Sequence, residues 1–410
     1  MSSGYRSHAD YRTPRLVEKY TIANSSRRTV VFIDDSPWEC FFHLAAILRM
    51  AGVRTVRVSV GLPRWQGDRF LFDRHVSLPK PPTPEHLARI FSSEYITDVQ
   101  PTESLALTTY AALNLLPESQ RSDFWVGRTT FLDKWRVASD LRGLGLRTPD
   151  TLLADVTTPI EAVQEFSLPI VIKRRVSSSG SGVEVFDTLE SLQRFVATIE
   201  RPNEWFFERF IQGRSLVCGS CVGKDGIDVI ATYEILERVN RLGSSSVVNI
   251  RNDASITETG RTLINAMQIR GMVCFDIIRD ADDVDWIHDI NPRAFGGISM
   301  CQMVGFDFFG AYLKCLVDDG AVKSSQLDSL GAIAFAFPYG WRHVLESPRR
   351  GIGWFHLVQW TWRYERLLGS RYFLSLAIRS LATSITKYRD RFRVQHFSLR
   401  DDVSSDFKAA

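Results

Sequence analysis

The sequence of 410 residues is poor in cysteine and lysine and contains no long apolar run. Six cysteines are too few for a disulfide scaffold, which favours a reducing, cytoplasmic compartment. No apolar stretch approaches the ~20 residues that cross a bilayer; the longest, near 331–337, has the length of a buried strand. Basic and acidic side chains number 50 and 47, too near balance for a protein whose main partner is nucleic acid. Only nine of the basic residues are lysines, so a lysine at the end of a strand or helix is a stronger indication of a functional role than an arginine there.

The N-terminal segment lacks both the apolar core of a secretory signal and the glycine that myristoylation requires after Met1. Residues 1–28 are polar and contain Arg and Ser, so we expect a disordered leader in preference to a transit peptide. The rest of the chain, with 44% hydrophobic and 24% charged residues, has the composition of a globular protein. Its length predicts two or three domains.

Strand and helix alternate directly after the leader. Thr29–Ile33 and Val53–Val60 read as buried strands on either side of an apolar helix at Phe41–Met50. This order predicts a small parallel α/β domain over residues 29–125. Asp34, Asp35, Ser36 and Pro37 suggest a helix N-cap, and the absence of Gly-x-Gly-x-x-Gly from this turn argues against a dinucleotide cradle.

Beyond residue 125 the pattern changes to α+β. A helix is expected at Phe131–Gly145 and a strand at Pro169–Lys173, followed by hairpin-connected strands over 206–236 and 272–290. We divide this part into residues 126–320, with a small lobe at about 150–205 and a large lobe at about 206–320, and a mainly helical region at 321–410.

The hairpin at 272–290 brings acidic residues together. If its turn is centred between residues 282 and 283, Asp276 lies opposite Asp289, and Asn291 projects from the same face. Two carboxylates and a carboxamide form an all-oxygen set that suits Mg²⁺ with phosphates completing the shell. The alternative is a register slip of one residue, which turns Asp276 to the other face as a solvated strand residue.

Two further segments carry polar groups at strand ends. A strand ends at Lys173 and is followed by the Ser- and Gly-rich loop Ser177–Gly182, whose backbone N–H groups and hydroxyls suit a phosphate chain. This is not a Walker A loop, and such loops are also common as plain connectors. Phe206–Gly213 reads as a strand that leads into a turn, and alone it would be an ordinary core strand.

In this order and spacing, the segments resemble the ATP-grasp superfamily, which includes D-alanine–D-alanine ligase, biotin carboxylase and the large chain of carbamoyl phosphate synthetase. The resemblance covers roughly 125–320. It is most specific in the run Asp289-Ile290-Asn291-Pro292-Arg293-Ala294-Phe295-Gly296-Gly297. It implies an ATP-grasp fold behind a small parallel α/β domain, with ATP and one or two Mg²⁺ (or Mn²⁺) ions as cofactors.

The resemblance also implies roles for individual residues. Lys134 and Lys173 would hold the ATP phosphates, and Ser178, Ser179, Gly180, Ser181 and Gly182 would close over them. Glu208, Arg209 and Ile211 would form the hinge that reads adenine. Asp276, Asp289 and Asn291 would bind the metal, and Arg293 would act with Lys173 in catalysis. Ser215 stands where many members have an acidic residue that binds ribose, so ribose recognition must be weaker or come from elsewhere.

The activity that the resemblance implies is an ATP-dependent, ADP-forming ligase. It would phosphorylate a small carboxylic acid to an acylphosphate and couple it to an amine or amino acid as an amide or peptide bond. The alternatives are a carboxylase or another oxyanion-phosphorylating enzyme, and a nucleotide-binding regulatory protein without turnover. No biotin-attachment motif occurs in the chain. Neither nucleic acid nor a transmembrane segment is expected, and a homodimer is favoured by its general frequency.

Three further signals favour structural roles. Cys218 and Cys221 have CxxC spacing but lie on an expected strand, which favours ordinary buried thiols over zinc or redox chemistry. His288 alternates with Trp286 and is expected in the core. Residues 341–393, rich in Arg and aromatics, are expected to form a helical region packed on the core, with a membrane surface or an acidic substrate as the alternative.

Overall fold

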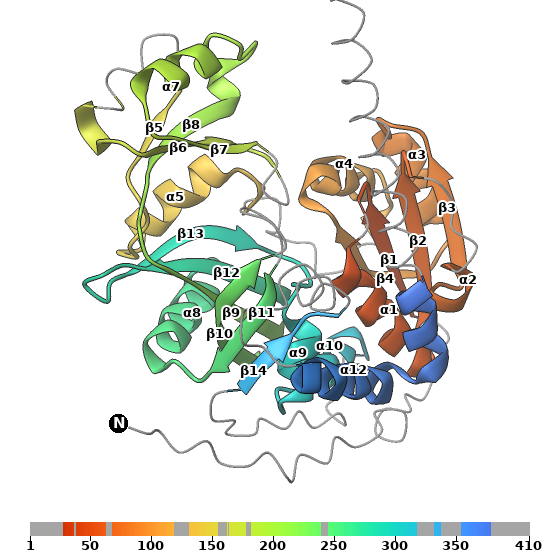
Figure 1. The fold of residues 1–410 in the computed structure, drawn as a ribbon. Coiled ribbons are helices and arrows are strands. Elements are labelled where there is room, and N and C mark those ends of the chain that lie inside the picture. Colours follow the sequence, from red (N-terminus) through yellow and green to blue (C-terminus); the bar gives the residue numbers. More distant parts are fainter. Residues whose placement is uncertain are drawn as a thin grey trace, which may run out of the picture.

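The structure is a computed structural model, and it describes residues 28–36, 38–62, 68–118, 131–154, 162, 164–177, 182–238, 245–317, 332–337 and 354–378. The expected leader lies almost entirely outside these residues. Figure 1 shows three sheets: a parallel sheet from the N-terminal part, a large antiparallel sheet, and a small sheet above the large one. Within the described residues no helix is long and apolar enough to span a membrane.

The N-terminal sheet is entirely parallel, with strand order β3-β2-β1-β4. Its elements are β1 (Thr29–Asp34), α1 (Glu39–Met50), β2 (Arg54–Val60), α2 (Asp68–Leu71), β3 (Arg74–Leu78), α3 (Pro84–Ser92), β4 (Ile96–Pro101) and α4 (Glu103–Asn114). The expected N-cap in Asp34–Pro37 is wrong. Helix α1 has Trp38 at its N-cap, without a side-chain hydrogen bond. Asp34 instead ends β1, where Arg57 binds it.

The large sheet is antiparallel, with strand order β13-β12-β9-β10-β11-β14. Its strands are β9 (Arg214–Gly223), β10 (Gly226–Arg238), β11 (Ser245–Arg251), β12 (Gly271–Arg279), β13 (Asp285–Asn291) and β14 (Ala332–Phe335). Helices α5 (Lys134–Gly143) and α8 (Ala254–Met267) pack on one face through a shared apolar core. Helices α9 (Ile298–Met303) and α10 (Phe308–Val317) pack on the other.

The small sheet has strand order β5-β8-β6-β7. Its elements are β5 (Thr151–Leu153), β6 (Ile170–Arg174), β7 (Val183–Phe186), α7 (Leu189–Val196), the 3₁₀ turn η6 (Pro202–Glu204) and β8 (Trp205–Arg209). It has an apolar core of its own beneath α7. Strand β8 leads directly into β9, so the hinge connects the small sheet to the large one (Figure 1).

One apolar core joins the N-terminal part to the large sheet. Helix α1 packs in it together with α9, α10 and α12 (Trp354–Leu368). Trp360 and Tyr364 of α12 are buried there, as expected for a helical region that packs on the core, whereas Trp362 is 54% exposed beside Arg366. The region after residue 320 also contributes β14, so it adds a strand to the large sheet.

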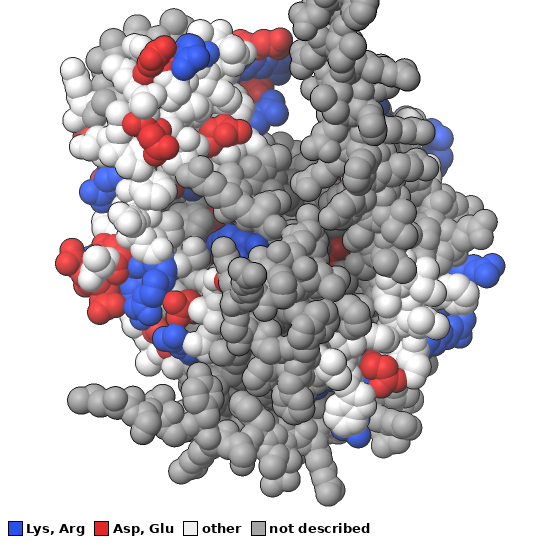
Figure 2. Space-filling view, in the orientation of Figure 1, with Lys and Arg blue, Asp and Glu red and all other residues white. Residues whose placement is uncertain are grey.

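On the face drawn in Figure 2, acidic and basic side chains of the described residues are intermixed. The acidic and basic side chains visible there form no extended field of one sign. This agrees with the near-balanced net charge of +3.

Several short strands escaped the sequence pattern. β5 and β7 have three and four residues, too few to show an alternation of apolar and polar side chains. β3 and β11 carry polar residues on both faces. These strands form because neighbours supply their hydrogen bonds, which a local pattern does not reveal. The expected helix at Phe131–Gly145 is shorter, because Asp133 caps it by accepting from the backbone N–H of Arg136 (3.3 Å).

Candidate functional site

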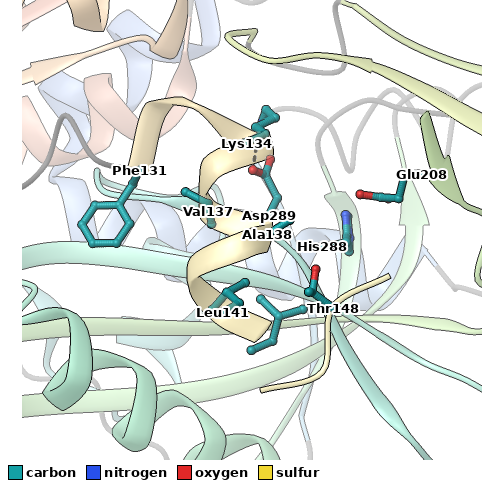
Figure 3. Close-up of a pocket in the computed structure, with 10 residues that line it drawn as sticks. Phe131, Lys134, Val137, Ala138, Leu141, Thr148, Glu208, His288 and Asp289 are labelled. Carbon is teal, nitrogen blue, oxygen red and sulfur yellow. Dashed lines mark hydrogen bonds and ion pairs between the residues drawn. The ribbon is translucent and has the colours of Figure 1, made fainter. Parts of the chain in front are cut away.

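A pocket lies where α5, the hinge end of β8 and strand β13 meet (Figure 3). It contains about 270 Å³ of empty space, part of which is open to solvent. Apolar side chains of α5 and charged groups of the neighbouring strands share its walls. The lining residues are Phe131, Lys134, Val137, Ala138, Leu141, Thr148, Glu208, Ile287, His288 and Asp289. An apolar wall with a few convergent charged groups is typical of small-molecule sites.

Lys134 stands at the first residue of α5 and reaches β13. Its ammonium forms an ion pair with Asp289, drawn as a dashed line in Figure 3. The helix end is fixed because Asp133 caps it and also binds the guanidinium of Arg175 (Nη2 to Oδ2, 2.5 Å). The backbone N–H of Lys134 donates to the carbonyl of Arg175 (2.9 Å), so the loop after β6 places this lysine.

Lys173 lies near the end of β6, and its ammonium binds Glu208 of the adjacent strand β8 (Nζ to Oε1, 2.5 Å). Both side chains are about 7% exposed. Lys173 also donates to the backbone carbonyl of His288 on β13 (3.3 Å), which links the small sheet to the large one. Burial raises the pKa of Glu208 above its ordinary value, against the opposing attraction of Lys173.

Asp276 of β12 is paired with Asp289 of β13, as the sequence predicts. The reasoning behind that prediction was partly wrong. Pairs near the turn, such as Arg279 with Asp285, follow a register one residue away from the predicted one. A bulge between these pairs and Asp276 restores the predicted register. The bulge therefore brings the two carboxylates onto facing positions.

The two carboxylates have opposite pKa shifts. Burial, together with the charge of Asp289, raises the pKa of Asp276 to about 6. Burial also acts to raise the pKa of Asp289, but the ammonium groups of Lys134 and Lys173 outweigh it and hold this pKa below its ordinary value. Positive charge acts on both members, but for Asp276 the effect of Arg238, Arg293 and Lys134 is smaller than that of burial and of Asp289.

Asn291 and Arg293 continue this cluster. The carboxamide nitrogen of Asn291 donates to Asp276 (3.0 Å), and its oxygen accepts from Arg293 Nη2 (3.2 Å). Arg293 Nη1 also donates to the carbonyl of Ala294 (2.8 Å), and its guanidinium lies 3.7 Å from the ring centre of Trp38, which belongs to the N-terminal part. The predicted metal ligands and the predicted catalytic arginine are therefore in direct contact with one another.

The remaining predicted residues occupy the hinge and the loop. Arg209 ends β8, and its guanidinium lies 4.9 Å from the ring centre of Trp286 on β13. Ile211 follows in the connection to β9, and Ser215 is half-buried near the start of that strand. Gly182 directly precedes β7. Ser178, Ser179, Gly180 and Ser181 lie outside the described residues.

The sequence assigned His288 to the core, and the structure corrects this. The bulge displaces His288 from the regular alternation, and its side chain lines the pocket (Figure 3). Burial lowers the pKa of His288 to about 3, so its imidazole is neutral. The apolar pocket residues of α5 were also missed. Their spacing, seen in Val137, Ala138 and Leu141, is that of a buried helix face and does not by itself distinguish a pocket wall from core.

The oxygen atoms of the acidic pair and of Asn291 form the donor set available to a metal ion. Among the described residues, no group of three or more His, Cys, Asp and Glu side chains could hold one. Asp276, Asp289 and Asn291 carry hard oxygen donors, and burial together with the charge of Asp289 raises the pKa of Asp276 although Arg238, Arg293 and Lys134 oppose it. They fit a divalent cation that takes its other ligands from a bound phosphate chain or water.

Comparisons with known proteins identify the fold. Residues 131–297 match the family described as ATP-grasp domain. No curated protein matches this sequence. Among solved structures, N5-carboxyaminoimidazole synthetase from Staphylococcus aureus, complexed with ADP, is similar with a TM-score of 0.60 and 13% identity over 75% of this chain and 81% of that chain.

Two other similar structures are enzymes with different reactions. The L-amino acid ligase from Bacillus licheniformis has a TM-score of 0.55 and 17% identity over 70% of this chain and 74% of its own. The biotin carboxylase domain of Hydrogenobacter thermophilus 2-oxoglutarate carboxylase, in complex with MgADP, ADP and bicarbonate, has a TM-score of 0.56 and 14% identity over 74% of this chain and 71% of its own. At such identities the likeness establishes the fold.

Proposed function

Because residues 131–297 form an ATP-grasp domain, we propose that this chain is an ATP-dependent, ADP-forming ligase. It phosphorylates the carboxylate of a small acid and couples the acylphosphate to an amine. The observation that carries the proposal is the convergence of Lys134 and Lys173 with the Asp276–Asp289 pair between the two sheets. Two ammonium groups beside two carboxylates can hold a phosphate chain together with a divalent cation.

In this proposal the nucleotide lies between the small and the large sheet. Lys134 and Lys173 give up their present carboxylate partners and bind phosphate oxygens, which are equally good acceptors of a charge-assisted hydrogen bond. Glu208, Arg209 and Ile211 read the adenine at the hinge, and the apolar face of α5 covers it. Gly182, which directly precedes β7, belongs to the loop that the resemblance assigns to the phosphates, and Ser215 lies near the ribose.

The metal of this proposal is Mg²⁺, held by Asp276, Asp289 and Asn291. When bound, it neutralises charge on the β- and γ-phosphates during transfer. The chain's own contribution is to hold both carboxylates on facing positions of one hairpin. Asn291 faces Asp276 with its carboxamide nitrogen and Arg293 with its oxygen, so its oxygen would have to turn toward the carboxylates to bind the metal.

Arg293 is the residue that meets the acid. A carboxylate is a poor acyl donor because its oxygen leaves poorly, and an acylphosphate removes that barrier. Arg293 orients the carboxylate and stabilises the charge that develops on the phosphoryl oxygens. Its stacking on Trp38 and its bond to the Ala294 carbonyl fix its position before the substrate arrives. Closure of the sheets around the site keeps water from the acylphosphate.

A second reaction is considered because of the similar structures: two of them are an N5-carboxyaminoimidazole synthetase and a biotin carboxylase domain. The same phosphate and metal groups could then phosphorylate bicarbonate in place of an organic acid. The cytoplasm remains the proposed location, since ATP is abundant there and all six cysteines are free thiols.

The test is ADP release from ATP and Mg²⁺ in the presence of acid and amine pairs, followed by mass analysis of the product. ADP release that requires both acid and amine supports the ligase, and release that requires bicarbonate supports the alternative. ADP release in neither case, although nucleotide binds, indicates a regulatory ATP-binding protein.

The matched variant is Asp289→Ala. It should abolish ADP release and leave the circular dichroism spectrum unchanged, because Asp289 is half-buried at a sheet edge. Full activity in this variant would remove Asp289 from the metal site.

A further inference from the structure

Cys218 and Cys221 have CxxC spacing, but the structure separates them. Both lie on β9, where neighbouring side chains alternate between the two faces of the large sheet. Cys218 belongs to the apolar core on the side of α5 and α8, and Cys221 to the core on the side of α9 and α10. Two thiols on opposite faces of a strand cannot bond to each other. Cys218 is thus a buried thiol, as the sequence predicts, whereas Cys221 has another partner.

Cys221 meets Cys315 of α10, which follows 94 positions later in the chain. The two sulfur atoms are 3.7 Å apart, which is van der Waals contact. A disulfide bond is about 2.0 Å long, so these sulfurs need to approach by about 1.7 Å. Rotation of the two side chains can bring them closer, because α10 already packs directly against β9. The fold thus holds two thiols from distant segments within reach of a covalent bond.

The two thiols differ in their access to solvent. Cys315 is partly exposed, whereas the other five cysteines of the chain are buried. Burial raises the pKa of the Cys218 thiol to about 12, and it also raises the pKa of Cys301. Buried thiols of this kind react slowly because the thiolate is the reacting form. A reagent from solvent therefore meets Cys315 first, and Cys221 reacts only with what Cys315 has already bound.

A partly exposed ion pair lies beside Cys315, between α10 and the sheet. Asp228 of β10 accepts from the ammonium of Lys314 with one oxygen (2.6 Å) and from the thiol of Cys315 with the other (3.8 Å from sulfur to oxygen). The side chain of Lys314 is 26% exposed. Because these polar groups border the thiol, a small hydrophilic reagent can approach Cys315 without entering the apolar core.

Helix α10 also connects the large sheet to the N-terminal sheet. Tyr312 stands three residues, or about one helical turn, before Cys315. Its hydroxyl donates to the carboxylate of Asp98 on β4 (2.6 Å), and both side chains are buried. A bond between Cys315 and Cys221 would therefore anchor to β9 the same part of α10 that holds β4.

We propose that Cys221 and Cys315 form a reversible disulfide when glutathione disulfide is in excess, independently of the ligase function. The thiolate of Cys315 attacks one sulfur of glutathione disulfide, forms a mixed disulfide and expels one glutathione thiolate. The thiolate of Cys221 then attacks the Cys315 sulfur, which closes the protein disulfide and expels the second glutathione thiolate. The two thiol protons pass to the two glutathione molecules, so the pair loses two electrons and glutathione disulfide gains them. Excess reduced glutathione reverses both steps, so a reducing compartment keeps the pair as thiols.

The experiment exposes the folded full-length chain to glutathione disulfide and follows its mass. The wild type should lose two hydrogen atoms without retaining glutathione, and a digest should contain a linked peptide pair that joins Cys221 to Cys315. Reduced glutathione should restore the original mass. Cys221→Ala should instead hold one glutathione on Cys315. In Cys315→Ala, modification of Cys221 should be slower by about tenfold or more, because Cys221 is buried.

Cys218→Ala is the matched control and should form the disulfide as the wild type does, because its side chain lies on the other face of β9. Circular dichroism before oxidation checks that each variant is folded. A stable glutathione adduct on Cys315 of the wild type would overturn the proposal, because Cys221 would then fail to displace the glutathione. A link between Cys218 and Cys221, or a wild type that stays fully reduced, would overturn it as well.

Discussion

Replacing Asp276 by Asn should stabilise the protein in the absence of metal. The pKa of Asp276 is raised to about 6 from its ordinary 3.8, because burial favours the protonated form. At neutral pH the folded state therefore contains an ionised carboxylate at a cost in stability. A shift of two units corresponds to about 3 kcal/mol. Asn resembles the protonated acid and can still accept from Asn291. The variant should therefore gain up to about 3 kcal/mol above pH 7.

The sign of the pH dependence follows from proton binding. Between about pH 4 and pH 6 folded Asp276 holds a proton that the unfolded chain has released. Its contribution to stability is thus complete at low pH and decreases as the pH rises through this window, at a rate approaching 1.4 kcal/mol per unit. The advantage of Asp276→Asn should be full at pH 8 and vanish near pH 4.

The assay is thermal unfolding at pH 8 and at pH 4.5, with and without Mg²⁺ and ADP. Without ligand the variant should melt several degrees above the wild type at pH 8 and close to it at pH 4.5. With ligand the wild type should gain more than the variant, because the variant has lost one anionic ligand. Asp282→Asn, at an exposed turn position of the same hairpin, is the control and should change neither value. A variant that is no more stable than the wild type at pH 8 would refute the reasoning.

Three further predictions concern neighbouring residues. Lys173→Met should weaken ATP binding at least tenfold in a nucleotide titration, with Lys224→Met in an exposed turn as the control; unchanged affinity would remove Lys173 from the phosphate site. Trp38→Leu should lower kcat with little change in KM for ATP, since it releases Arg293 from its stack. A fall in kcat accompanied by an equally large rise in KM for ATP would instead indicate general misfolding. Gln100→Leu should cost about 1–3 kcal/mol in chemical denaturation, because it leaves buried Asp98 short of a donor.

Much of the candidate site could be predicted because its residues are close together in sequence. The hairpin that carries Asp276 and Asp289 is a local element, so its expected turn predicted that the two carboxylates pair, although a bulge is needed to restore that register beyond the turn. The run from Asp289 to Arg293 likewise brings ligand and arginine within a few residues. The strand that ends at Lys173 was predicted from its apolar run.

Other parts depend on contacts between distant segments. The bulge that places His288 in the pocket lies between β12 and β13, whereas β12 stays in unbroken register with β9, and no local pattern records it. The ion pair of Lys134 with Asp289 joins residues 155 positions apart. Gln100 and Ala294 meet across 194 positions.

By itself, the sequence determined the longer elements and which of their side chains share a face, because periodicity and turn residues act over a few positions; the short or polar strands β3, β5, β7 and β11 were not predicted. Only the tertiary structure decided what those faces meet: that Trp38 stacks on Arg293, and that Lys134 pairs with Asp289. The physical reason is that contacts between distant segments arise from packing, where the shape and charge of one segment select another. The local pattern of one segment does not indicate which other segment it will contact.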